Sequence, residues 1–164
     1  MYDGERLQML LQKEKNYRLK GSISYLMMDP TEGFKFLIAI RNEVDLEAYA
    51  MYVRMLTQTN THDVPLEMLL KAYEGLKQED LMSKEEIDKL AELPEELTIY
   101  RGTDALEYPP RISWSLLESK ARTFENGQMY KATINKSDIL AYYSSNGDEE
   151  EIIAHVTDNF DDIF

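Results

Sequence analysis

The chain has 164 residues, of which 43% are hydrophobic and 10% aromatic, enough to build the core of one domain and too many for a disordered protein. Asp and Glu number 31 against 18 Lys and Arg, which gives a formal net charge of −13 at pH 7. Binding to a phosphate backbone needs clustered cationic side chains, so the charge argues against a nucleic-acid partner and favours basic partner proteins. The sequence holds no cysteine, which excludes disulfides, thiolate zinc sites and thiol catalysis.

No segment approaches the roughly eighteen consecutive apolar residues that a membrane-spanning helix needs. The stretch MYDGERLQMLLQKEK carries charges where a signal peptide has its apolar segment. We therefore expect a cytoplasmic protein without membrane association, while delivery into a host cell without a signal peptide stays open. No metal site is apparent in the sequence, and we expect none.

Residues 1–92 are predicted to be helical. Apolar residues recur three and four positions apart, first in LQMLLQKEKNY and most regularly in DVPLEMLLKAYEGLKQ. Asp29 followed by Pro30 is typical of a helix start, and Ser83 three residues before Glu86 matches a capping box. We interpret the apolar stripes of these helices as core packing.

The pattern changes near Leu93, where short β-rich runs replace the helical periodicity. The runs are LTIYRG, RISWSL, GQMYKATI, ILAYYS and EIIAHV, with one short helical piece, LLESKARTF, after the second. Helices first and short strands second predict an α+β fold, with a helical part over 1–92 and a small, mostly antiparallel sheet over 93–164. We expect both parts to form one compact domain.

Tyr100, Arg101 and Gly102 end the first of these strands. The planar guanidinium of an arginine suits a phosphate or carboxylate, and a glycine allows a ligand to approach the backbone closely. An arginine at a strand end is also commonly structural or solvated, so this motif alone is weak.

Ser113 and Ser115 flank Trp114 in the second strand. Alternation along a strand directs both serines to one face and the indole to the other, where it would pack into the core. The serine hydroxyls could hydrogen-bond a ligand or a neighbouring carboxylate. A strand with a simply wet polar face is the alternative.

The stretch GDEEEIIAH places four acids directly before an apolar run. If the strand begins near Glu149, then Glu149 and Glu151 share one face, with β-carbons ~7 Å apart. One carboxylate could stabilise a positive transition state while the second accepts a proton. Asp148 and Glu150 are expected to lie in solvent, and a solvated turn is the alternative for the whole stretch.

In this order, the aromatic-Arg-Gly strand, the Ser-x-Ser strand and the Glu-x-Glu strand resemble the arginine–serine–glutamate class of mono-ADP-ribosyltransferases. The resemblance spans residues 97–157, a little over a third of the chain. It implies an ADP-ribosyltransferase-like core over 93–164, with NAD as co-substrate. A compact member of this class would suit an effector made by a phage or a bacterium.

The resemblance assigns residues to the NAD site. Arg101, with Tyr100 and Gly102 beside it, would hold NAD through its phosphates and the adjacent ribose. Ser113 would orient the catalytic glutamate, and Ser115 would lie beside it in the same site.

The resemblance also assigns the catalytic residues. Glu151 would contact the nicotinamide ribose and stabilise the oxocarbenium ion that forms as nicotinamide leaves. Glu149 would prepare the acceptor, a protein side chain on a cationic surface, and a glutamate at that position is typical of enzymes that modify arginine.

Two features depart from the family pattern. Trp114 stands where the family usually has Thr, and the link GTDALEYPPRI between Arg101 and Ser113 is shorter than in better-known members. Two other functions therefore stay open: an NAD glycohydrolase that uses the same pocket, and a non-enzymatic acidic binding or inhibitor protein.

Overall fold

The computed structural model describes residues 29–104, 107, 109–144 and 150–163. Contacts divide the chain into two compact units between Leu81 and Met82, a helical unit and a sheet unit. The sequence placed the boundary at residue 92, but helix α7 (Lys84–Glu92) is grouped with the sheet unit and contacts strand β4 (Ala141–Tyr143). The helix expected in LQMLLQKEKNY lies outside the described residues.

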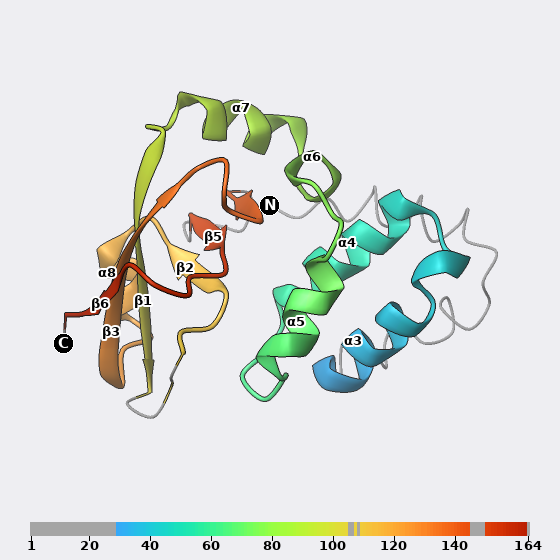
Figure 1. Ribbon diagram of the computed structural model, residues 1–164, viewed down its shortest axis with the longest axis horizontal. Helices are drawn as coiled ribbons and strands as arrows, with labels where there is room; N and C mark the ends of the chain where they lie inside the picture. Colours follow the sequence, from blue (N-terminus) through green and yellow to red (C-terminus); the bar gives the residue numbers. More distant parts are fainter. Residues whose placement is uncertain (1–28, 105–106, 108, 145–149, 164) are drawn as a thin grey trace. The chain divides into compact units, whose positions relative to one another are not determined.

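The described part of the helical unit contains four α-helices and one 3-10 turn (Figure 1). They are α3 (Pro30–Ala39), η1 (Arg41–Glu43), α4 (Leu46–Thr57), α5 (Leu66–Tyr73) and α6 (Gln78–Leu81). Helix α3 contacts both α4 and α5, and α4 contacts α6. None of the helices in the described residues is long and apolar enough to cross a membrane.

Local signals in the sequence account for the start of α3 and for the packing of α4. The carboxylate of Asp29 accepts a hydrogen bond from the amide of Glu32 at 3.3 Å, and Pro30 occupies the first turn, which confirms the predicted cap. From Ala48 to Thr57 every residue of α4 is buried, so this helix forms the centre of the unit. A helix buried on all sides supplies packing and leaves no polar face for a ligand.

The sheet unit contains α7, a short helix α8 (Glu118–Arg122) and six strands within the described residues. The strands are β1 (Glu96–Asp104), β2 (Ser113–Ser115), β3 (Gly127–Asn135), β4, β5 (Glu151–Ile153) and β6 (Phe160–Asp162). They form one sheet in the order β4-β5-β2-β1-β3-β6, and every neighbouring pair is antiparallel. This arrangement confirms the α+β class and the antiparallel sheet.

Helix α7 begins with the capping box that the sequence predicts. The hydroxyl of Ser83 accepts from the amide of Glu86 at 3.2 Å, and the carboxylate of Glu86 accepts from the amide of Ser83 at 3.0 Å. Glu86 is fully buried, so its carboxylate is held at the start of the helix and does not lie in solvent.

Strand β6 was not predicted, because FDD has neither alternation nor β-branched residues. It pairs with β3, and Phe160 meets the ring of Tyr130 edge-on with 5.3 Å between centroids. The contact with a buried tyrosine accounts for this strand better than the β-propensity of its three residues does.

Candidate active site

Strand β2 lies between β1 and β5, and this order brings the three sequence motifs together. Ser115 is paired with Glu151 of β5 on one side and with Tyr100 of β1 on the other. Paired residues of antiparallel strands share a face, so Ser113, Ser115 and Glu151 lie on the same side of the sheet. Trp114 lies on the opposite side and is 2% exposed, as alternation predicted.

A direct hydrogen bond joins the serine and glutamate motifs. The Ser113 hydroxyl donates to Oε2 of Glu151 over 2.6 Å, although the two residues are 38 positions apart in the sequence. Glu151 is only 8% exposed, so its carboxylate is held in a largely dry position. A buried carboxylate with a fixed hydroxyl donor can stabilise a neighbouring positive charge more strongly than one in water.

Arg101 is held by protein atoms at each of its three guanidinium nitrogens. Nε and Nη2 donate to the two carboxylate oxygens of Glu107 at 2.7 and 3.0 Å, a bidentate pair. Nη1 donates to the backbone carbonyl of Ser113 at 2.7 Å. The guanidinium therefore spans from the loop after β1 to the start of β2, and its planar fork is occupied by Glu107.

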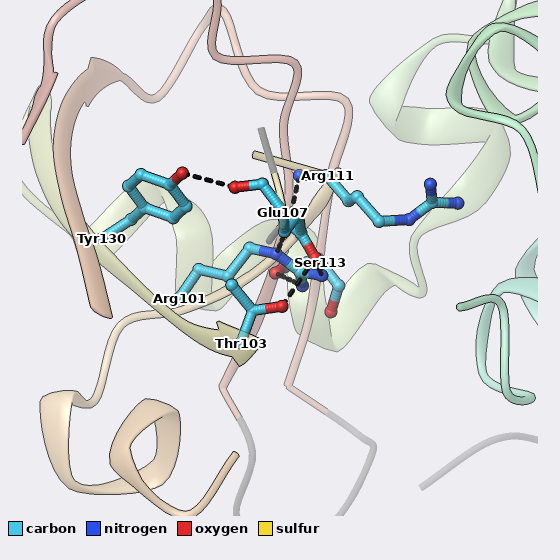
Figure 2. A network of polar contacts seen from close by, with 6 residues as sticks. All are labelled: Arg101, Thr103, Glu107, Arg111, Ser113 and Tyr130. Atoms are coloured by element: carbon cyan, nitrogen blue, oxygen red, sulfur yellow. Dashed lines mark hydrogen bonds and ion pairs between the residues drawn. The ribbon is translucent and has the colours of Figure 1, made fainter. Parts of the chain in front are cut away.

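Glu107 gathers further donors from both sides of the link (Figure 2). Its carboxylate accepts from the Thr103 hydroxyl at 2.6 Å and from the Arg111 amide at 2.9 Å. Its own amide donates to the carbonyl of Asp104 at 3.1 Å, and its carbonyl accepts from the Tyr130 hydroxyl at 2.7 Å. The side chain of Arg111 points away from this cluster in Figure 2, so only its backbone takes part.

Burial raises the pKa of Glu107, but the surrounding donors outweigh burial and hold the pKa below its usual value. The hydrogen bond and the charge of Arg101 contribute most of the lowering, with smaller contributions from Thr103 and the Arg111 amide. Glu107 is therefore ionised at neutral pH, and the Arg101–Glu107 contact is a true ion pair. Only 16% and 9% of the two side chains are exposed.

Two residues assigned to the NAD site, Gly102 and Ser115, contact α8 and its flanking residues within the sheet unit. A β-carbon on Gly102 would lie 2.0 Å from the carbonyl oxygen of Ala121 and 2.8 Å from the amide of Glu125, so the end of α8, rather than a ligand, approaches this glycine. The Ser115 hydroxyl accepts from the amide of Leu117 at 3.0 Å, next to the start of α8. The close approach expected of a ligand at Gly102 is thus made by the protein itself.

The acidic turn differs from the expectation in two ways. Strand β5 begins at Glu151, and Glu150 has φ of +46°, a left-handed conformation that interrupts the extended backbone. The expected spacing of ~7 Å between Glu149 and Glu151 assumed an unbroken strand, so it does not follow here. Glu149 and Asp148 lie outside the described residues.

Glu150 is half-buried and not solvated as predicted, because it accepts a hydrogen bond from the hydroxyl of Tyr142 on β4. Burial and then the bond and charge of Glu150 raise the pKa of Tyr142, so this hydroxyl remains a donor. The carbonyl of Glu150 accepts from the amide of Leu116 at 3.1 Å. Side chain and backbone together therefore anchor the residue that precedes Glu151.

Glu107, Thr103 and Tyr130 escaped the sequence analysis. The available signal was weak: Glu107 is one acid in a link between an arginine motif and a serine motif, and such links commonly carry solvated charges. Only the tertiary structure, which places the Glu107 carboxylate against Arg101 and Thr103 at the end of β1, reveals the ion pair.

A polar cavity of about 540 Å³ lies elsewhere in the sheet unit and includes none of the motif residues. It is lined by Glu96, Thr133, Ile134, Asn135, Asn159 and Asp161. Glu96 is the first residue of β1, whereas Arg101 lies toward the other end of the strand, so the cavity is separate from the motifs.

Comparison with protein-family models, curated proteins and solved structures finds no significant match to this chain. None of the three comparisons therefore assigns the chain to a family.

Proposed function

We propose that this chain is an NAD-dependent mono-ADP-ribosyltransferase that modifies a protein side chain, with arginine as the acceptor. The observation that carries the proposal is a line of two hydrogen bonds through the three motifs. Arg101 donates to the carbonyl of Ser113, and the hydroxyl of Ser113 donates to Glu151. The resemblance requires an arginine, a serine and a glutamate in one site, and this line supports that requirement.

NAD would supply an ADP-ribosyl group whose bond to nicotinamide breaks as positive charge develops on the ribose. Nicotinamide leaves with the bonding electron pair, and the acceptor nitrogen forms the new bond. Such a reaction needs a fixed anion beside the developing cation more than it needs an acid. The buried carboxylate of Glu151, oriented by Ser113, is suited to that role.

Arg101 fits NAD less directly than the resemblance implies. Its nitrogens already donate to Glu107 and Ser113, so it does not present a fork to a phosphate. Its contribution is better described as holding the start of β2, which carries Ser113.

The acceptor is proposed from charge and from the acidic turn. A protein with net charge −13 attracts cationic surfaces, where arginine side chains are exposed. A guanidinium is protonated in water and must lose a proton as its nitrogen bonds the ribose. Glu149 would take that proton, a role that rests on the sequence motif alone.

The test is release of nicotinamide and transfer of label from tagged NAD, with the full chain incubated in a cytosolic extract. Glu151→Gln keeps the size of the side chain but removes its charge, so we expect both activities to fall by at least about 10²-fold. Glu92→Gln, an exposed acid of α7, is the matched control and should leave both unchanged.

Equal labelling by the wild type and by Glu151→Gln would overturn the proposal. Nicotinamide released without labelled protein, and lost in Glu151→Gln, would instead identify an NAD glycohydrolase. No release and no NAD binding by the wild type would leave the acidic binding protein as the function.

A further inference from the structure

We infer that Glu107 is a positioning residue for this site: it holds Arg101 on the carbonyl of Ser113 and so keeps the Ser113 hydroxyl directed at Glu151. The inference rests on the proposed function and names a residue that no motif includes. It also gives Arg101 a different task from the phosphate contact that the resemblance implies.

Many contacts converge on Glu107. Both oxygens of its carboxylate accept two hydrogen bonds each, from Arg101, Thr103 and Arg111. The backbone amide of Glu107 donates to the carbonyl of Asp104, and its carbonyl accepts from the hydroxyl of Tyr130. These two bonds hold the residue from two further directions. A carboxylate with four donors is fully satisfied, so its position is strongly determined.

The ladder between β1 and β2 is short. These strands share a single register pair, Tyr100 with Ser115, whereas β1 and β3 are paired along their full length. The Arg101 side chain adds a hydrogen bond from β1 to the carbonyl of Ser113, at the start of β2. A long side chain can replace a ladder bond only if its far end is held, and Glu107 holds it.

Ser113 is held from two directions at once. Its carbonyl meets Arg101 on the β1 side, and its hydroxyl meets Glu151 of β5. Displacement of the carbonyl would therefore shift the hydroxyl donor away from the carboxylate. A misplacement of about 1 Å in a catalytic site costs on the order of 10²-fold in rate.

A blocking role for Glu107 makes the opposite prediction. The donors around its carboxylate are also those that would suit a phosphate, so Glu107 could occupy an anion site and lower affinity for NAD. Removing Glu107 would then improve NAD binding. If Glu107 positions Ser113, its removal slows the chemical step and leaves NAD affinity nearly unchanged.

The experiment measures kcat and the KM for NAD of nicotinamide release, with the full chain, four test variants and one control variant. Glu107→Gln, Arg101→Gln and the double variant test the ion pair, and Thr103→Val removes one of the four carboxylate bonds. Glu118→Gln breaks the exposed pair between Glu118 and Arg122 on α8 and serves as the control.

We expect Glu107→Gln to lower kcat by about 10- to 100-fold and to change KM by less than about twofold. Arg101→Gln should lose the same factor, and the double variant no more than either alone, because the two residues act as a unit. Thr103→Val should lose about three- to tenfold in kcat and tests the inference even if Glu107→Gln folds poorly. Glu118→Gln should match the wild type.

The inference is overturned if Glu107→Gln keeps its kcat, or if its KM for NAD falls. It is also overturned if Arg101→Gln raises only the KM, because Arg101 would then contact NAD itself. In each of these outcomes the wild type is active, so the proposed function stands while the role of Glu107 does not.

A wild type that releases no nicotinamide would instead overturn the proposed function. In that case amide hydrogen exchange tests whether Glu107 positions Ser113. The amides of Leu116 and Ala154 bond the carbonyls of Glu150 and Ile112 across β2 and β5. Faster exchange of both in Glu107→Gln than in the Glu118 control would support the positioning role. Equal exchange would overturn it.

Discussion

The contacts of Arg101 determine whether this residue binds a ligand or stabilises the protein. A guanidinium at a strand end can bind a ligand's phosphate or hold the protein's own backbone. Here the carboxylate of Glu107 neutralises it, and the pair is mostly buried. Breaking such a pair from one side leaves an uncompensated buried charge, so its cost far exceeds that of an exposed ion pair.

This ion pair makes stability depend on pH in a predictable direction. The pKa of Glu107 is lowered in the folded protein, so its contribution is present above the unfolded value of 4.5 and is lost as pH falls through the folded pKa. Glu107→Gln should therefore be less stable than the wild type by about 3–5 kcal/mol at neutral pH. Denaturant unfolding at a series of pH values should show the gap narrowing below pH 4.5.

A gap that stays constant down to strongly acidic pH would contradict this expectation. It would mean that the loss in Glu107→Gln comes from packing or hydrogen bonding rather than from the charge of Glu107. The Glu118→Gln variant should show little change throughout, because its pair with Arg122 is exposed.

At the scale of elements, α8 and the sheet constrain each other through one glycine. Helix α8 contacts both β1 and β2, and its last turn reaches the backbone of Gly102. Ser115 bonds the amide of Leu117 at the other end of the helix. A five-residue helix is too short to be stable alone, so these contacts account for its presence.

Gly102→Ala should therefore destabilise the protein strongly. The added β-carbon would meet a backbone oxygen at 2.0 Å, and a backbone group cannot rotate away as a side chain can. We expect a loss of about 3 kcal/mol in the free energy of unfolding, measured by chemical denaturation. Thr98→Ala, at an exposed position of the same strand, should change it by less than about 0.5 kcal/mol. A neutral Gly102→Ala would mean that α8 does not lie against β1.

At the scale of the whole molecule, the chain contains two units with separate cores. The helical unit packs around α4, and the sheet unit packs around buried residues such as Ile99, Trp114 and Tyr130. Every described residue of the candidate site lies after Met82, in the sheet unit. The helical unit therefore contributes no described side chain to that site.

A fragment that spans 82–164 should consequently fold without the rest of the chain. We expect a single cooperative thermal transition in near-ultraviolet circular dichroism, with a stability of several kcal/mol, as is usual for a small domain. Glu107→Gln should lower the transition temperature of the fragment as it does in the full chain. A fragment without a cooperative transition would show that the sheet unit depends on the helices.

Local patterns in the sequence were enough to predict the α+β order, the caps at Asp29 and Ser83, and the burial of Trp114 between two serines on the opposite face. Caps and strand alternation act over two to four residues, so they can be recognised without knowing the fold. The sequence also predicted that Ser113 and Glu151 lie in one site. That prediction came from the order of the motifs and not from any distance between the residues.

Only the tertiary structure decided which groups meet Arg101, Gly102 and Glu150. Their partners, Glu107, the end of α8 and Tyr142, come from other elements or loops, and the path of the chain brings them into contact. The partner of a charged side chain depends on which opposite charge the fold places beside it. The sequence around a glycine likewise does not indicate which group will pack against its backbone. For that reason the sequence by itself pointed to Arg101, Ser113 and Glu151, and only the fold added Glu107 and Thr103 and decided that the arginine is held by a glutamate.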